Sequence, residues 1–208
     1  MDQRYSDHLT QYKANYTFTE TERQQSELCG IRITVTLYEY DTKAEHRDRA
    51  EILMEKGGLR YGCEGIERTH WDLFPVTVDG RSYILFSKTL YGFTLIDPDT
   101  LTETYDYFPE KVYDGEESFI ITDAKTFGRY LIFEGCYWGC PYEFVAYDHE
   151  LGAFVGLSAL CEVYDGGSRI EGDRLILSGL DTGMERTEVS LTDADIERLL
   201  MEYGVDDL

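Results

Sequence analysis

Two cysteines stand four positions apart in the segment GCYWGCPY, which covers residues 135–142. The spacing of Cys136 and Cys140 suits half of a zinc site, a redox pair or the turn of a β-hairpin. Zinc needs four ligands, and the sequence offers neither a second close cysteine pair nor two histidines at ligand spacing, so we expect no metal site. Redox motifs of the thioredoxin type have a different spacing and begin a helix. The hairpin turn is therefore the preferred interpretation.

A hairpin here would place two thiols and three aromatic rings together. With a three-residue loop, Cys136 and Cys140 face each other at a separation that allows a switchable disulfide. The loop would carry Tyr137 and Trp138 outward with Tyr142 nearby, and such residues anchor protein or sugar interfaces. The competing interpretation is that Trp138 folds back as a lid on the core.

The rest of the chain offers few groups that could do chemistry. Of four histidines, only His70 adjoins an expected aromatic wall, at Trp71, and we count both as candidate binding residues. No nucleophile elbow, phosphate-binding loop or dinucleotide fingerprint occurs. Among 41 acidic residues, a catalytic carboxylate pair cannot be singled out. We therefore predict no catalytic residue and no cofactor. The sequence does not decide whether the protein is an enzyme, and we favour a binding function.

The elements that must position these residues are mostly strands. From residue 71 onward, short runs of β-branched and aromatic residues alternate with turn signals such as Asp79-Gly80 and Asp97-Pro98-Asp99. Both the turn glycines and the turn aspartates recur at intervals of 44 to 51 residues: Gly80, Gly128 and Gly172, and Asp97, Asp148 and Asp193.

A recurring unit of this size resembles a β-propeller blade or a repeated β-meander. The alternative is chance recurrence of turns in an ordinary all-β protein. The resemblance covers residues 71–193 and extends to no particular family, because Trp71-Asp72 opens its segment instead of closing one as in WD-type blades. Gly30 stands 50 residues before Gly80 and is compatible with a fourth, decayed unit.

The two ends of the chain have different patterns. Alternation predicts a half-buried strand over residues 31–37, and weaker signals predict helices over 2–12 and 43–56, the latter ending at Gly57-Gly58. Helical spacing of Ile196, Leu199, Leu200 and Tyr203 predicts a helix over 193–204. We expect one all-β, mostly antiparallel domain over 1–208. Its parts are an irregular region over 1–70, hairpin units over 71–193 and the C-terminal helix. The hairpin units are expected to form either a propeller-like arrangement or an open meander.

Charge narrows the choice of partner. The 41 acidic and 19 basic residues give a net charge of −22, which repels nucleic acid and anionic membranes. No signal sequence or spanning segment is evident, and five cysteines suggest a reducing, cytoplasmic setting. We expect a soluble, acidic protein-binding module, in its narrowest version an inhibitor or immunity-type protein for a basic protein. The alternative is a carbohydrate-binding or carbohydrate-acting protein.

Overall fold

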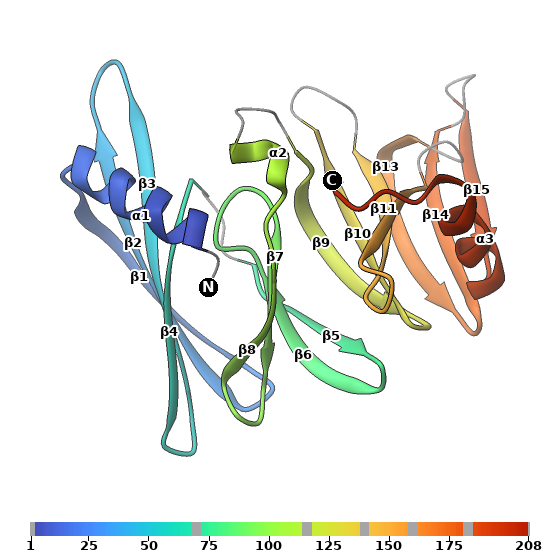
Figure 1. Cartoon of the computed structure of the whole chain (residues 1–208), viewed down its shortest axis with the longest axis horizontal. Helices are drawn as coiled ribbons and strands as arrows, with labels where there is room; N and C mark the ends of the chain where they lie inside the picture. Colours follow the sequence, from blue (N-terminus) through green and yellow to red (C-terminus); the bar gives the residue numbers. More distant parts are fainter. Residues whose placement is uncertain are drawn as a thin grey trace. The chain divides into compact units, whose positions relative to one another are not determined.

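The computed structural model describes residues 3–67, 72–113, 118–137, 142–157, 162–180 and 185–207 (Figure 1). Four antiparallel sheets follow one another along the chain, and the strands of each sheet are in sequence order. The prediction of a mostly antiparallel β fold, built from repeated hairpins with helices near both ends, is confirmed.

The first sheet contains β1 (Thr19–Leu28), β2 (Ile31–Asp41), β3 (His46–Lys56) and β4 (Leu59–Ile66). The second contains β5 (Phe74–Val78), β6 (Arg81–Phe86), β7 (Phe93–Asp97) and β8 (Thr102–Tyr107). The third contains β9 (Ile120–Phe127), β10 (Tyr130–Cys136), β11 (Glu143–Asp148) and β12 (Ala153–Gly156), and the fourth contains β13 (Glu162–Glu171), β14 (Arg174–Leu180) and β15 (Arg186–Leu191). The helices are α1 (Gln3–Asn15), α2 (Glu110–Tyr113) and α3 (Asp193–Tyr203).

Each sheet begins with a hairpin whose turn holds a glycine in the left-handed region. The φ angles of Gly30, Gly80, Gly128 and Gly172 are 71°, 72°, 57° and 62°, a region that costs other residues steric strain. The recurring glycines therefore mark equivalent hairpins, and the first sheet is the fourth copy of the unit. A propeller-like arrangement of the sheets stays a prediction.

The recurring aspartates are equivalent in two copies of three. The Asp97 carboxylate accepts hydrogen bonds from the backbone N–H groups two and three residues ahead, at 2.7 and 3.1 Å. Asp148 does the same in the third sheet, at 2.9 and 3.2 Å. This local bonding closes the turn between the last two strands of a sheet. In the fourth sheet Asp193 instead begins α3, which stands where a fourth strand would follow.

The predicted helix over 43–56 is wrong, because most of this segment forms β3. The spacing of Thr42 and Glu45 suggested a helix cap, but the Thr42 hydroxyl accepts from the N–H groups of Ala44 and Glu45 inside the β2–β3 turn. Gly57-Gly58 is the next hairpin turn, not the end of a helix. Pairing with the neighbouring strands and burial of the apolar face of β3 outweigh the helix propensity of this charged segment.

The predicted C-terminal helix is confirmed as α3. The Thr192 hydroxyl accepts from the Asp195 N–H, while the Asp195 carboxylate accepts from the Thr192 N–H, a reciprocal capping box. Gly204 follows the last turn. Ile196 and Leu200 are buried, whereas Tyr203 points to solvent. The predicted N-terminal helix is also present as α1, which ends three residues later than expected.

The chain divides into two compact units, residues 1–75 with 82–108 and residues 76–81 with 109–208. The single domain expected from the sequence stays a prediction. In the first unit, the apolar faces of β2 and β3 pack on β6 and β7: Ile31, Ile33, Val35, Ala50, Ile52, Met54, Ile84, Phe86 and Ile96. In the second, α3 packs on the third and fourth sheets: Phe127, Ile132, Phe144, Val155, Leu175, Leu177, Ile196 and Leu200. Within the described part of the chain, no helix is long and apolar enough to cross a bilayer.

Candidate interaction surface and buried charged cluster

The predicted aromatic loop follows β10, and part of it lies outside the described residues. Tyr137 is half-buried, with its ring edge-on to Phe119 at 5.5 Å and the Lys111 ammonium 5.6 Å from its centroid. Burial raises the pKa of the Tyr137 hydroxyl, and nearby carboxylates add to the shift. Tyr142 is 42% exposed. Trp138 lies outside the described residues, so the predicted cluster of three rings stays a prediction.

The other candidate residues are only partly placed. Cys136 is the last residue of β10, opposite Ile120 of β9, and is partly exposed. Cys140, His70 and Trp71 lie outside the described residues, and the disulfide stays a prediction. The loop does take the place predicted for it: it joins the two central strands of the third sheet, as residues 87–92 join those of the second. Among the described residues, no three His, Cys, Asp or Glu side chains gather as a metal site would require.

An exposed apolar surface lies at the C-terminal end of α3. We define the α3 surface as Leu151, Met201, Tyr203 and Val205, whose exposed fractions are 64%, 75%, 67% and 48%. Val205 pairs with Phe154 across the edge of β12, with N–H to O distances of 2.8 Å in both directions, which joins the end of the helix to the third sheet. The sequence pattern does not reveal this surface, because helical spacing places Tyr203 on the apolar face of the helix with Ile196 and Leu200.

Arg129 connects α3 to the β11–β12 turn by ion pairs. From the β9–β10 turn, its guanidinium lies 3.0 Å from the buried Asp148 carboxylate, 3.7 Å from Glu150 and 3.8 Å from Glu197 of α3. Its carbon CZ also lies 5.2 Å from the centre of the Tyr130 ring. These contacts bring the turn that carries Leu151 beside the helix that carries Met201.

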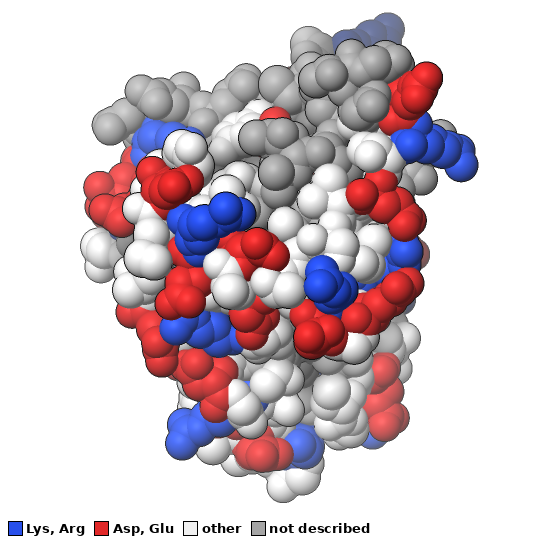
Figure 2. Space-filling model, turned by 90° about the vertical axis from the view of Figure 1, so that its right-hand side faces the viewer, with Lys and Arg blue, Asp and Glu red and all other residues white. Residues whose placement is uncertain are grey.

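The unit that contains the α3 surface is the more acidic one. Residues 76–81 and 109–208 contain 23 acidic and 8 basic residues, a net charge of −15, against 18 and 11, a net charge of −7, in the first unit. Figure 2 shows acidic side chains distributed over one face of the molecule, with fewer basic ones among them. Charge near the α3 surface is therefore predominantly negative, with Arg129 already shared among carboxylates.

A second feature, which the sequence patterns do not indicate, is a buried charged cluster in the first unit. The Lys88 side chain has no exposed area, and its ammonium lies 2.6 Å from the Glu103 carboxylate and 3.0 Å from that of Asp106. Thr94 donates its hydroxyl hydrogen to Asp106 at 2.6 Å, and Tyr61 donates to Glu103 at 2.5 Å. We call these residues the Lys88 cluster.

The pKa values in the Lys88 cluster follow from burial and bonding. Burial alone would raise the pKa of Glu103, but hydrogen bonds from Lys88 and Tyr61 outweigh it and hold this pKa at about 2. Burial raises the pKa of the neighbouring Cys63 thiol to about 12, so this thiol is not a nucleophile at neutral pH. The cluster is thus a buried network of hydrogen bonds and ion pairs, which suits a structural role.

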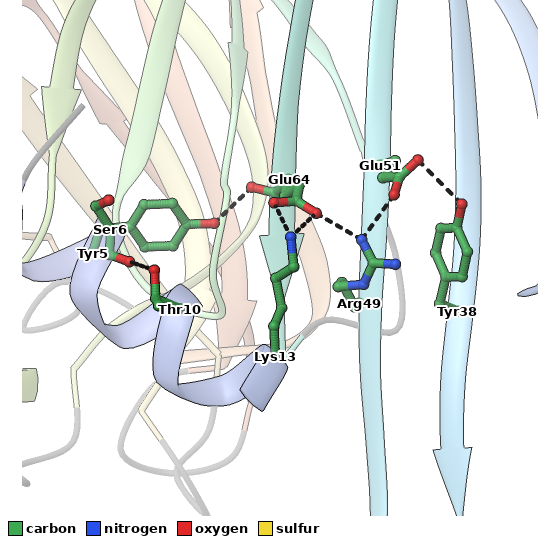
Figure 3. A network of polar contacts seen from close by, with 8 residues as sticks. All are labelled: Tyr5, Ser6, Thr10, Lys13, Tyr38, Arg49, Glu51 and Glu64. Carbon is green, nitrogen blue, oxygen red and sulfur yellow. Dashed lines mark hydrogen bonds and ion pairs between the residues drawn. The ribbon is translucent and has the colours of Figure 1, made fainter. Parts of the chain in front are cut away.

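Carboxylate pairs matter for the carbohydrate alternative. Glu51 of β3 and Glu64 of β4 lie opposite each other, and Nη1 of Arg49 donates to both, at 2.9 and 2.7 Å (Figure 3). Burial would raise the pKa of Glu51, but hydrogen bonds from Arg49 and Tyr38 lower it overall. In the second unit, burial raises the pKa of Glu134, which lies opposite Asp123.

Comparisons with known proteins identify no relative. No protein-family model, no curated protein and no solved structure matches this chain. The residues themselves are therefore the only basis for a functional assignment.

Proposed function

We propose that this chain is a non-catalytic binding protein that engages a basic protein through the α3 surface. The observation that carries the proposal is the group of exposed apolar side chains on the end of α3, in the more acidic unit. An inhibitor or immunity-type protein that masks a basic toxin or nuclease is the narrowest version of the proposal.

Physical reasons favour a contact surface at this place. Single exposed apolar residues are ordinary on proteins, but Met201, Tyr203 and Val205 fall within five positions, and the ion pairs of Arg129 connect α3 to the turn that carries Leu151. Large apolar side chains surrounded by charge are typical of the centre and rim of protein interfaces. The negative field would accelerate encounter with a basic partner and reject acidic ones.

The test uses the chain as bait for capture from native lysate, followed by affinity measurement with the purified partner. We expect a basic partner whose affinity falls at least tenfold between about 50 and 500 mM NaCl, since screening weakens charge attraction. The double variant Met201→Ser/Tyr203→Ser should lose binding. The matched control is Leu59→Ser, which removes an exposed apolar side chain from the β3–β4 turn region of the first unit and should bind as wild type.

Three outcomes would contradict the proposal: a partner that is acidic, an affinity that ignores salt, or a double variant that binds as tightly as Leu59→Ser.

The carbohydrate alternative remains second. A glycosidase pairs a carboxylic acid of raised pKa with an ionised carboxylate. Glu51 and Glu64 do not fit, since Arg49 bonds to both and the pKa of Glu51 is lowered, not raised. Glu134 with Asp123 fits better, because burial raises the pKa of Glu134 and the Asp123 carboxylate lies 2.8 Å from the Lys125 ammonium. Release of nitrophenol from a panel of nitrophenyl glycosides by wild type, and its loss in Glu134→Gln, would favour the alternative over the binding proposal.

A further inference from the structure

A groove of about 780 Å³ crosses the outer face of the first sheet. The cross-strand register explains its position. Thr34, Leu53 and Gly62 lie side by side on β2, β3 and β4 and form an uncharged row. Two residues along the strands in one direction, the matching row is Thr36, Glu51 and Glu64; in the other, it is Arg32, Glu55 and Arg60. An uncharged floor thus lies between Glu51 and Glu64 on one side and Arg60 on the other, while Arg32 and Glu55 of that last row do not line the groove.

The floor is deepest at Gly62, where a side chain is missing. A Cβ added there would meet nothing closer than the Ile52 carbonyl oxygen, at 3.9 Å. The backbone of Gly62 is not in the left-handed region, so neither space nor conformation requires glycine here. The absence of a side chain leaves room on the face of the sheet.

The carboxylates of the groove are neutralised within the protein. Glu64 accepts hydrogen bonds from the Lys13 ammonium of α1 at 2.7 and 2.8 Å, and it shares Arg49 with Glu51 (Figure 3). The positive charges of Lys13 and Arg49 therefore balance the negative charges of Glu51 and Glu64. This side of the groove has little net charge that could attract a ligand.

The arginines of the groove keep donors to spare. Arg23 of β1 donates its Nε hydrogen to Thr36 at 3.3 Å and lies 3.5 Å from the exposed Glu20. The Arg60 side chain makes no hydrogen bond or ion pair with any residue that the structure describes, although Glu55 stands opposite it in the register. A guanidinium has five N–H donors in a planar fork that matches carboxylate and phosphate.

The two arginines stand at opposite corners of the groove. They are three strands apart and four residues apart along the strands, which places their Cα atoms about 20 Å from each other at ~4.8 Å per strand and ~3.4 Å per residue. Each side chain reaches roughly 6 Å by covalent bond lengths, so about 8 Å separates the guanidinium groups when both lean inward. One small anion cannot contact both.

We infer that the groove binds an elongated dianion, a molecule with an acidic group at each end and an uncharged middle. One acidic group pairs with Arg23 and the other with Arg60, while the middle lies on Thr34, Leu53 and Gly62 beside Leu9 of α1. The volume is typical of a small-molecule site. The groove and the α3 surface are in different units, so this inference does not depend on the proposed function.

The test measures binding of linear α,ω-dicarboxylates of increasing length by amide chemical-shift titration at about 100 mM NaCl. We expect affinity to peak between about six and ten carbon atoms, with shifts at the amides of Thr34, Leu53 and Gly62. A monocarboxylate of equal length should bind at least tenfold more weakly. A peptide with aspartates at both ends of a glycine spacer, tested in parallel, distinguishes a free dianion from an acidic peptide segment as the source of the chemistry.

Variants isolate the two parts of the site. Arg60→Gln and Arg23→Gln should each lower the affinity of the best dicarboxylate at least tenfold and remove the preference for length. Arg32→Gln is the matched control, an exposed arginine of the same face that does not line the groove.

Gly62→Leu should fill the floor and abolish binding without loss of stability. Gly156→Leu is its control, since a Cβ at that exposed strand glycine meets nothing within 4 Å. Absence of binding by wild type at 10 mM dicarboxylate, equal affinity for the monocarboxylate, or wild-type binding by Gly62→Leu would overturn the inference.

Discussion

At the scale of single residues, Lys88 has the most demanding environment. Its ammonium is removed from water and depends on Glu103 and Asp106 for compensation. Lys88→Met would leave two carboxylates beside an apolar side chain, and loss of one partner of a buried ion pair costs about 3–5 kcal/mol. We expect a decrease of that size in the free energy of unfolding, measured by urea denaturation.

The control for this prediction is Lys56→Met. Lys56 also contacts a carboxylate, Asp99, but its side chain is 32% exposed, so the loss should stay below about 1 kcal/mol. Equal effects of the two substitutions would mean that the Lys88 cluster has no special role in stability.

The low pKa of Glu103 predicts a dependence of stability on pH. Its folded pKa of about 2 lies below the ordinary value of 4.5, so the ionised form stabilises the fold above pH 4.5. This contribution decreases as pH falls from 4.5 toward 2. Glu103→Gln should therefore lose less stability than wild type over this window, measured as urea midpoints at pH 6, 3.5 and 2.5. Parallel pH profiles for the two proteins would refute the assignment.

The Lys88 cluster could not be predicted from the sequence, and the reason is a β-bulge. Glu103 and Asp106 are three residues apart and would face opposite sides of a regular strand. Between them, Thr104 is an extra residue in the β7–β8 pairing, which turns both carboxylates to one side. A lysine in a loop is usually exposed to solvent. The sequence therefore does not indicate that Lys88 pairs with the carboxylates of Glu103 and Asp106.

At the scale of elements, the first residue of GCYWGCPY has a structural explanation. A Cβ on Gly135 would collide with the Ile120 carbonyl oxygen and the Phe119 ring, beside the bulge where β9 gains a residue against β10. Gly135→Ala should lower the free energy of unfolding by about 1–3 kcal/mol, since the neighbours are backbone and a buried ring.

Gly156→Ala is the comparison for that experiment, because its Cβ enters open space. Calorimetric midpoints of the two variants should differ clearly, with Gly156→Ala close to wild type. A Gly135→Ala midpoint equal to that of Gly156→Ala would show that the third sheet adjusts at no cost.

The capping box of α3 supports another prediction. Thr192→Ala removes the side chain that accepts from the Asp195 N–H, and caps of this kind contribute about 0.5–2 kcal/mol. Thr187→Ala on β15, a threonine that caps no helix, should change the free energy of unfolding by less than about 0.5 kcal/mol. Urea unfolding of both variants tests this, and identical small losses would exclude a significant cap.

The sequence predicted α3 well and β3 wrongly for related reasons. In α3 the cap, the apolar spacing and the final glycine all agree. In β3, charged residues with good helix propensity conceal a period of two, in which Ala50, Ile52 and Met54 face the core. That alternation indicates a strand. The cap-like spacing of Thr42 and Glu45 indicates the start of a helix and led to the wrong prediction.

At the scale of the whole molecule, net charge should limit stability at low ionic strength. A charge of −22 creates self-repulsion that the unfolded chain relieves and that salt screens. We expect the thermal midpoint to rise between about 10 and 300 mM NaCl; each 1 kcal/mol of screened repulsion corresponds to about 2–4 °C for a chain of this size. A midpoint that falls with salt would mean that attractive ion pairs, such as those of Arg129, outweigh the repulsion.

The overall organisation was accessible from the sequence because turn chemistry is local. Gly80, Gly128 and Gly172 could be recognised by their neighbours alone. The α3 surface and the groove were not accessible, since both depend on which side chains neighbouring elements leave uncovered. Arg60 and Gly62 have no sequence signal that separates them from any exposed strand residue.

The order of strands has a consequence for how the chain matures during synthesis. In the described sheets every strand pairs with a strand adjacent in sequence, so each sheet can form as soon as its own segment leaves the ribosome, without waiting for distant residues. Among the described residues, one segment departs from this rule: α3 and Val205 return to the third sheet and close the edge of β12. Until this segment is synthesised, the nascent chain carries an open strand edge, and the arrival of Val205 is the event that protects it.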